Sequence, residues 1–402
     1  MNPRWPTVRL GDEVTLLSGG TPKKSEPRYW GGNIPWVSSG EMKQRRISDT
    51  ELHVTDDGAD NGTRRVPEKT VLIVVRGMSL AKEFRVAITQ REITFNQDLK
   101  ALVQSEKVDS GFLFYYLLSQ NTSIRDSATE ASHGTKKLET CVLQDWPLPI
   151  PSLNQQREIV SILSAYDDLI ENNLRRIRLL EESARLLYRE CFVRLRFPGH
   201  EHTRIIDGVP EGWERTTAGE LSMFLKRGIT PKYDEDGEST VINQKCIRNG
   251  SLDLGPARRQ SKEVPPLKRV RIGDVLVNST GQGTLGRVAQ VKAELEEHTV
   301  DSHVTIVRPS QVVGRHYFGQ VLLEYEPLLA SMGRGATNQT ELSRDDIAAL
   351  PVILPEQSLA IEYENYCDPL FQQTTNLTMQ CERLRQARDL LIPKLMSGEI
   401  TA

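Results

Sequence analysis

The stretch WPLPIPSLNQQREIV, residues 146–160, sets closely spaced prolines directly before a run with helical spacing. A similar stretch, LPVILPEQSLAIEYE, follows at residues 350–364, so that Pro151 and Pro355 occupy matching places. Proline is tolerated just before a helix and disrupts its interior. The sequence therefore predicts that the chain enters a long helix twice, each time from an extended connector.

Apolar residues recur every seven positions after each proline stretch, which favours two long helices that pair as a coiled coil. At about 40 residues, each helix would be roughly 60 Å long. The alternative is that each helix packs only on its own domain. Asn173 would fix the register opposite Leu377, Thr374 and Arg388 would loosen the second helix, and Pro393 would end or kink it. The predicted pairing residues are Ile159, Leu163, Ile170, Asn173, Ile177, Leu180, Leu187, Leu370, Leu377, Leu384 and Leu391.

The segments before the two helices also match each other. WPTVRLGDEVTLLSGGTP (5–22) is similar to WERTTAGELSMFLKRGITP (213–231), and TVLIVVRG (70–77) to DVLVNSTG (274–281). Short runs rich in Val, Ile and Thr between Gly and Asp are typical of strands. Each half is therefore expected to be a strand-rich domain with a few helices, followed by one long helix.

Composition bounds the protein class. The 402 residues are 38% hydrophobic and 26% charged, with a net charge of −3, which is typical of a soluble protein of two or more domains. The five cysteines show no CxxC spacing and indicate thiols in a reducing cytosol, so we expect a cytoplasmic protein. No apolar run is long enough to span a membrane. Because the chain is not basic, a nucleic-acid function would depend on local patches.

The sequence offers little that resembles an active site. GQGTLG, residues 281–286, matches GxGxxG, but a strand-like segment follows it where a nucleotide site needs a helix. A tight hairpin, or a close approach of the backbone to a ligand, is the better interpretation. The pair Asp167 and Asp168 is expected on a solvated helix face. We therefore expect no catalytic residues and no metal site in this chain.

Polar loops flanked by glycine remain as candidates for contact with nucleic acid. Arg reads guanine and Asn or Gln reads adenine, whereas Ser, Thr and Lys hold phosphates. Such loops occur in both halves, and HGTKKLET (133–140) and GRGATNQTELS (333–343) precede the two proline stretches in the same way. The predicted DNA-binding residues are Ser38, Ser39, Lys43, Arg45, Arg46, Arg76, Lys82, Arg85, Thr135, Lys136, Lys137, Asn243, Gln244, Lys245, Asn278, Ser279, Gln282, Arg287, Thr337, Asn338 and Gln339.

Taken together, these features resemble the specificity (S) subunits of type I restriction–modification enzymes. The resemblance covers nearly the whole chain and includes the opening Trp…Gly…Thr-Pro pattern, both proline stretches and the ending LLIPKLMSGEI (390–400). It implies an α+β fold, with two strand-rich α/β target-recognition domains separated by two long helices that form an antiparallel coiled coil. The implied boundaries are 1–147 for the first domain, 148–197 for the central helix, 198–212 for a linker, 205–351 for the second domain and 352–402 for the C-terminal helix.

The resemblance also implies the function and the partners. Each domain would bind one half of a bipartite, asymmetric target in double-stranded DNA, while the helices set the spacing. Two modification (methyltransferase) subunits would dock on the chain, and restriction subunits would add translocation and cleavage. S-adenosylmethionine, ATP and magnesium would then belong to these partners, and the chain itself would bind no cofactor. The competing hypotheses are a coiled-coil scaffold that never reads DNA and an enzyme with an unrecognised site.

Overall fold

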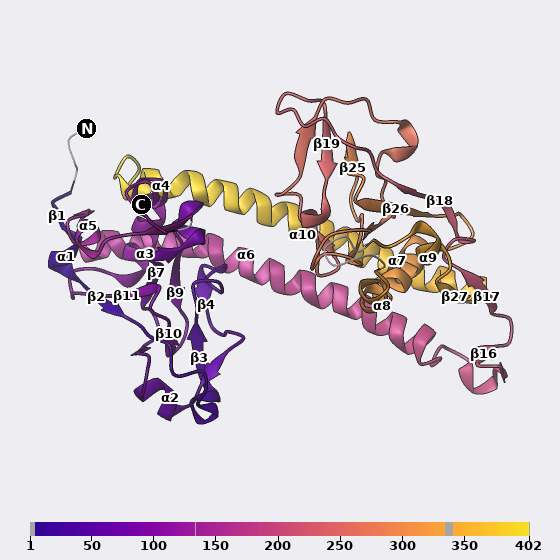
Figure 1. Ribbon diagram of the computed structural model, residues 1–402, viewed down its shortest axis with the longest axis horizontal. Coiled ribbons are helices and arrows are strands. Elements are labelled where there is room, and N and C mark those ends of the chain that lie inside the picture. Colours follow the sequence, from indigo (N-terminus) through magenta and orange to yellow (C-terminus); the bar gives the residue numbers. More distant parts are fainter. Residues whose placement is uncertain (1–4, 133, 334–340, 402) are drawn as a thin grey trace. The chain divides into compact units, whose positions relative to one another are not determined.

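A computed structural model describes residues 5–132, 134–333 and 341–401 of the chain (Figure 1). The chain divides into two compact units, and each long helix contributes to both. The first unit contains residues 1–171 and 381–402, and the second contains residues 172–380. No helix in the described ranges has the length and apolar character needed to cross a bilayer.

A five-stranded sheet forms the inner part of the first unit, with two helices packed beside it (Figure 1). Its elements are β2 (Val14–Ser18), β4 (Arg46–Ile47), β7 (Val71–Val74), β9 (Val86–Thr89), β11 (Leu99–Gln104), α3 (Ser110–Ser119) and α4 (Asn121–Asp126). The strand order is β2-β11-β7-β9-β4, and all pairs are antiparallel except β4 with β9. Every residue of β7 and β9 is buried, as expected for strands that are covered on both faces.

Shorter sheets complete the first unit. Its remaining elements are β1 (Thr7–Arg9), α1 (Leu10–Glu13), η1 (Pro27–Tyr29), β3 (Trp30–Val37), β5 (His53–Val54), α2 (Asp56–Asp60), β6 (Arg65–Val66), β8 (Arg76–Gly77), η2 (Met78–Ala81), β10 (Ile93–Phe95), β12 (Thr129–Ser132), β13 (Thr135–Lys137), α5 (Thr140–Gln144) and β14 (Pro147–Pro149). One sheet has the order β5-β3-β10-β6 and another has the order β12-β13-β8. Strand β1 pairs with the proline-rich β14, which is an edge position that tolerates proline.

The second unit repeats this plan. It contains β15 (Ile205–Ile206), β16 (Val209–Pro210), β17 (Glu214–Thr217), β18 (Ser222–Arg227), β19 (Ser239–Ile242), η5 (Gln244–Cys246), β20 (Ile247–Arg248), β21 (Ser251–Leu252), β22 (Arg258–Gln260), η6 (Pro266–Lys268), β23 (Val275–Asn278), β24 (Val288–Gln290), β25 (His298–Val300), β26 (Val304–Pro309), α7 (Arg315–Glu324), α8 (Glu326–Ser331), α9 (Arg344–Ala348) and β27 (Pro351–Leu354). The order β18-β26-β23-β24 matches β2-β11-β7-β9, and β17 pairs with β27 as β1 pairs with β14. The structure therefore confirms the internal repeat predicted from the sequence.

The two long helices are α6 (Leu153–Tyr188), extended by a π-helical turn at Arg189–Val193, and α10 (Gln357–Met396). Both start about five residues later than the predicted helix boundaries, because residues 147–149 and 351–354 form strands. Part of the predicted linker is also ordered as the hairpin β15–β16. Pro393 does not end α10, which continues to Met396.

Within each unit, a segment of α6 packs against a segment of α10. In the first unit Ile159 and Leu163 are buried in one core with Ile392, Leu395 and Met396. In the second unit the Tyr363 hydroxyl donates to the backbone O of Ala184 at 3.1 Å, and Ser183 bonds Tyr366 at 2.8 Å. Residue numbers rise along one helix as they fall along the other, so the helices pair antiparallel in both units.

The predicted seam residues differ in burial. Ile159, Leu163, Ile170, Asn173 and Leu377 are buried, and the other predicted pairing residues are half-buried, namely Ile177, Leu180, Leu187, Leu370, Leu384 and Leu391. Asn173 Nδ2 donates to Gln380 Oε1 at 3.5 Å. The amide of Asn173 thus has a polar partner, as a register-fixing residue requires.

Candidate nucleic-acid interface

Two polar segments predicted to contact DNA lie side by side in the first unit. The backbone N of Leu138 donates to Val75 O at 2.8 Å, and β13 pairs with β8 so that Lys137 lies opposite Arg76. Short helix η2 packs against β13. This arrangement forms a basic edge, defined as Arg76, Lys82, Thr135, Lys136 and Lys137. Arg76 and Lys82 are exposed, and the other three residues are half-buried.

The second unit places the corresponding segments together in the same way. Leu342 N donates to Ser279 O at 2.8 Å, and Thr280 forms an antiparallel bridge with Glu341. After a shift of 204 positions, these two pairs correspond to Leu138 with Val75 and to Lys137 with Arg76. The predicted contact residues Thr337, Asn338 and Gln339 lie outside the described residues.

The GQGTLG stretch, residues 281–286, forms the tight turn between antiparallel strands β23 and β24. Its three glycines have φ values of +106°, +71° and +76°, which residues with a side chain rarely adopt. A Cβ at Gly286 would overlap the backbone of Ala330 in α8. The hairpin interpretation is therefore correct, and the helix that a dinucleotide site requires after this motif is replaced by a strand.

Buried polar side chains next to this turn stabilise it through hydrogen bonds. Asn278 Nδ2 donates to Gln244 O at 3.1 Å and to Thr284 O at 3.0 Å, while the Ser279 hydroxyl bonds that of Thr305 at 2.6 Å. Asn278 and Ser279 are both 0% exposed. Both side chains are therefore enclosed by their own unit, where Asn278 donates to backbone O atoms and Ser279 bonds a side-chain hydroxyl. Their burial does not favour the predicted contact with DNA, which stays a prediction.

The remaining predicted residues of the second unit surround the turn. Gln244 Nε2 donates to Thr280 O at 2.6 Å, and Asn243 caps η5 by accepting from Lys245 N at 2.9 Å. Arg287 donates to Gly283 O at 2.7 Å. Gln282 and Lys245 are exposed, so they present the free polar ends of this surface.

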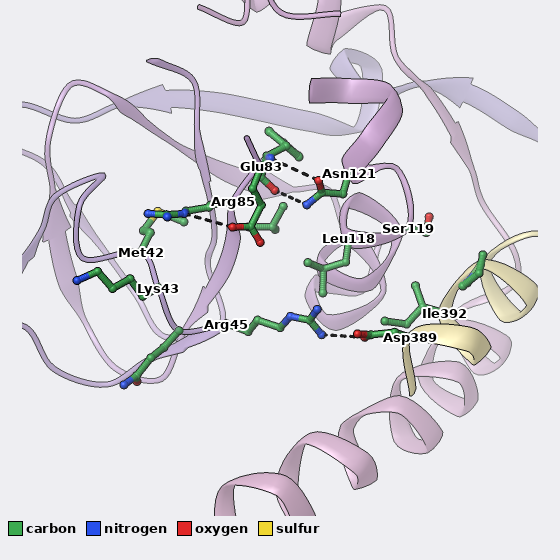
Figure 2. A pocket seen from close by; sticks show the side chains of 14 residues that line it. Met42, Lys43, Arg45, Glu83, Arg85, Leu118, Ser119, Asn121, Asp389 and Ile392 are labelled. Carbon is green, nitrogen blue, oxygen red and sulfur yellow. Dashed lines mark hydrogen bonds and ion pairs between the residues drawn. The ribbon is translucent and has the colours of Figure 1, made fainter. Parts of the chain in front are cut away.

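A polar cavity of about 400 Å³ lies in the first unit between the loop before β4, the start of β9, α3, α4 and the end of α10 (Figure 2). Lys43, Arg45 and Arg85 line it, together with Asn121 and Asp389. Figure 2 shows Arg45 pointing to Asp389, at 3.3 Å. Asn121 Nδ2 donates to the backbone O of Phe84, just before β9, at 2.6 Å. Of the three cations, Lys43 is exposed and lies away from the ion pair.

Other predicted residues near this cavity support the fold. Arg46 forms ion pairs with Asp168 and Glu171 on α6. Burial disfavours its charge, but the two carboxylates outweigh burial and raise the pKa of Arg46. Ser39 O accepts from Arg85 Nη1 at 3.4 Å, and Ser38 N donates to a Glu41 carboxylate at 3.1 Å. In this arrangement Arg46 holds the domain to its helix, so the structure gives it a packing role that the sequence did not indicate.

A buried charge network joins the first domain to both helices. Asp167 of α6 bonds the Arg388 guanidinium of α10 and accepts from the Tyr115 hydroxyl of α3 at 2.6 Å. Asp167 and Arg388 are each 5% exposed, so the expectation of a solvated Asp167 is wrong. Arg388 has an ionic partner inside the seam. Burial and the neighbouring Asp167 raise the pKa of Tyr115, which keeps the hydroxyl protonated as a donor.

The second unit uses a different anchor at its corresponding helix junction. Glu364 of α10 accepts from the backbone N of His316 at 3.1 Å and of Tyr317 at 2.8 Å, which satisfies the free N–H groups at the start of α7. His316 Nε2 bonds Asp368 at 2.8 Å, and its ring lies 4.2 Å from that of Phe371. Burial lowers the pKa of His316, so the neutral imidazole is favoured.

Comparison with known proteins places the chain in a family. Residues 2–182 match the family described as type I restriction modification DNA specificity domain. The MjaIX specificity subunit of Methanocaldococcus jannaschii is 25% identical over 98% of this chain and 93% of that protein. The chain belongs to the specificity subunits of type I restriction–modification enzymes.

Further specificity subunits extend the comparison. The HindI subunit of Haemophilus influenzae is 21% identical over 98% of this chain and 99% of that protein. The crystal structure of a type I S subunit from M. genitalium has a TM-score of 0.60 at 17% identity, covering 98% of this chain and 96% of the other, which supports the same fold. The chain is thus a recognition subunit, and these relatives favour DNA recognition over a scaffold that does not read DNA.

The residues that position the surfaces of this specificity subunit carry almost no signal in its sequence. Asp167 and Tyr115 gave no sign of being partners because they are 52 residues apart and each is common on an ordinary helix. The pairing of Glu364 with the start of α7 was equally hidden. One signal was present: Arg388 falls in an otherwise apolar heptad row, and an arginine buried there needs a carboxylate partner.

Proposed function

We propose that this specificity subunit reads a bipartite, asymmetric DNA target, with one half bound by each unit. The observation that carries the proposal is the repeated juxtaposition of a glycine turn with the segment before the proline strand. Val75 with Leu138 and Ser279 with Leu342 share the same 2.8 Å backbone bond in two units of otherwise different sequence. Two domains that bind different half-sites are expected to share a backbone arrangement and to differ in their exposed side chains.

The surface chemistry is consistent with this role. The basic edge of the first unit offers ammonium and guanidinium groups, which bind phosphates, and the exposed Gln282 of the second unit offers an amide, which suits adenine. The whole chain has a net charge of only −3, so it lacks a strong general attraction to DNA. We therefore expect tight binding only in a complex whose other subunits supply further phosphate contacts.

The long helices are proposed to serve as a ruler and as a docking surface. They pair antiparallel within each unit, and each runs from one unit into the other. Apolar side chains of α6 remain exposed, including Leu169 at 46%, Leu179 at 61% and Leu186 at 50%. Exposed apolar stripes mark surfaces for protein partners. We assign this surface to two modification subunits.

The chemistry would reside in those partners. In this account the modification subunits bind S-adenosylmethionine and methylate adenine, which requires that the target base leave the stack. Restriction subunits, where present, would use ATP and magnesium for translocation and cleavage. The complex would act on DNA in the cytoplasm, and the chain described here would select the site without a catalytic residue of its own.

Salt dependence tests the DNA-binding surface. The target is first found by mapping methylated adenines in cells that express the chain with its modification subunits. Binding of that duplex by the purified complex is then measured at several salt concentrations. Changing Arg76 and Lys136 to alanine should reduce the slope of log affinity against log salt by about 1.8, because each lost phosphate contact contributes about 0.9.

A matched control removes two cations elsewhere. Arg194 and Arg196 are exposed, pair with Glu190 and directly follow the π-helical turn that extends α6. Their change to alanine should leave the slope unaltered. An unchanged slope in the Arg76 and Lys136 variant would contradict a DNA-facing basic edge, and DNA retention insensitive to every such change would favour the scaffold hypothesis.

A further inference from the structure

One apolar side chain is exposed in the middle of the basic edge. Met78 is 72% exposed, and the exposed Arg76 and Lys82 flank it in the chain. A lone exposed apolar residue is ordinary on a protein surface. Met78, however, begins η2 directly after Gly77, whose φ is +129°. The backbone therefore presents this side chain at a defined point of a tight turn.

The turn that carries Met78 is firmly supported. Leu80, two residues further on, is 0% exposed and anchors η2 in the core. The backbone N atoms of Lys82 and Glu83 donate to Ser79 O at 3.0 and 2.9 Å, and Gly77 pairs with Lys136 of β13. A side chain on such a support can hold one position against a ligand.

The second unit presents a different residue at the corresponding point. Gln282 directly follows Gly281, whose φ is +106°, and its side chain is exposed. The 2.8 Å bond from Leu342 to Ser279 fixes this turn as the bond from Leu138 to Val75 fixes the first. Position and exposure are thus shared, while the chemistry changes from a thioether to an amide.

We propose that Met78 and Gln282 are equivalent base-reading residues and that Met78 packs against the C5-methyl group of a thymine. This inference rests on the proposed DNA-reading function and names the chemistry that one of its positions recognises. In the major groove an apolar side chain discriminates thymine through its methyl group, whereas a glutamine amide discriminates adenine. The cations Arg76, Lys82 and Lys136 beside Met78 favour a polyanionic ligand over an apolar protein surface at this point.

The test removes the methyl group from the DNA and the thioether from the protein. Each thymine of both half-sites is replaced in turn by deoxyuridine, and affinity is measured for the complex with wild-type chain, Met78→Ala and Met78→Gln. One thymine in one half-site should cost the wild type about fourfold in affinity when its methyl is removed, which corresponds to ~0.8 kcal/mol for one buried methyl group. Met78→Ala should lose this sensitivity at that thymine alone.

Met223→Ala is the matched control. Met223 is exposed like Met78 of the other unit, at 62%. It lies at the end of β18 that pairs with Pro309. The opposite end of β18 pairs with Thr305, which also pairs with β23, the strand that leads into the glycine turn. The control should respond to deoxyuridine as the wild type does. Equal responses of Met78→Ala and wild type at every thymine would overturn the inference, as would a loss of complex assembly in place of a base-specific effect. A wild-type complex insensitive to deoxyuridine at every thymine would also overturn the inference, whereas the proposed function itself would fail only if that complex bound the bipartite target no better than an unrelated duplex.

Discussion

The buried ion pair between Asp167 and Arg388 gives a sharp prediction about stability. Changing Arg388 to methionine leaves the Asp167 carboxylate buried, with only the Tyr115 hydroxyl still donating to it. The side chains of Asp167 and Arg388 are 7% and 6% exposed, so water does not replace the lost partner. Removing one member of such a pair costs about 3–5 kcal/mol.

Thermal unfolding can measure this cost. For a unit in the size range of roughly 150–250 residues, each kcal/mol lowers Tm by about 2–4 °C, so we expect Arg388→Met to lower the transition of the first unit by about 6–20 °C. Hydrogen exchange assigns the loss, because faster exchange should appear in α3 and in the adjoining parts of α6 and α10. The second unit should keep its wild-type protection.

Two further variants separate charge from packing. Arg383→Met removes an exposed cation of the same helix and should have little effect. A triple variant with Asp167→Leu, Tyr115→Phe and Arg388→Met removes the charges and the hydroxyl together, and it should recover most of the lost stability. A shift below about 1 kcal/mol for Arg388→Met, or a triple variant no better than the single one, would refute the reasoning.

Three other predictions concern the remaining elements. The folded state lowers the pKa of His316, so below pH 6.5 the unfolded chain binds a proton that the folded chain does not. The free energy of unfolding of the second unit should therefore fall by up to about 1 kcal/mol between pH 6.5 and 5.5. Denaturation at both pH values checks this loss, which His316→Gln should remove. Gly228→Ala would drive its Cβ into the backbone O of Val300, and denaturation should show a cost of about 2–3 kcal/mol that Ala at an exposed surface site does not cause. Deleting residues 170–176 and 374–380 shortens each helix by roughly 10 Å; methylation mapping should then show a shorter spacer or no activity, and an unchanged spacer would contradict the ruler.

Much of the fold could be predicted because its main features repeat along the chain. The shift of 204 positions between Pro151 and Pro355 located both helices, and matching Val- and Ile-rich runs located the sheets. The proline stretches were expected to be extended, and they are. Their pairing with β1 and β17 was not foreseen, because the partner strand of a proline-rich segment lies more than a hundred residues away and leaves no periodic pattern.

The candidate site was predictable only in outline. The sequence identified the polar loops, and the structure brings two of them together in each unit. The sequence alone does not distinguish exposed from buried polar residues. Asn278 and Ser279 were therefore expected on the surface, although they are 0% exposed. Arg46 was expected on DNA for the same reason. A polar side chain with internal partners looks identical in sequence to one without them, because those partners come from distant segments.

The most direct test of the account is a genome-wide map of methylated adenines from cells that express the modification subunits with one of three chains. These are the wild type, a variant with Arg76 and Lys136 changed to alanine, and a variant with Gln282 changed to alanine. The account predicts that the wild type methylates one bipartite sequence, that the first variant relaxes or loses only one half of it, and that the second affects only the other half. An identical map from all three chains, or a change in the same half-site from both variants, would contradict the claim that each unit reads its own half.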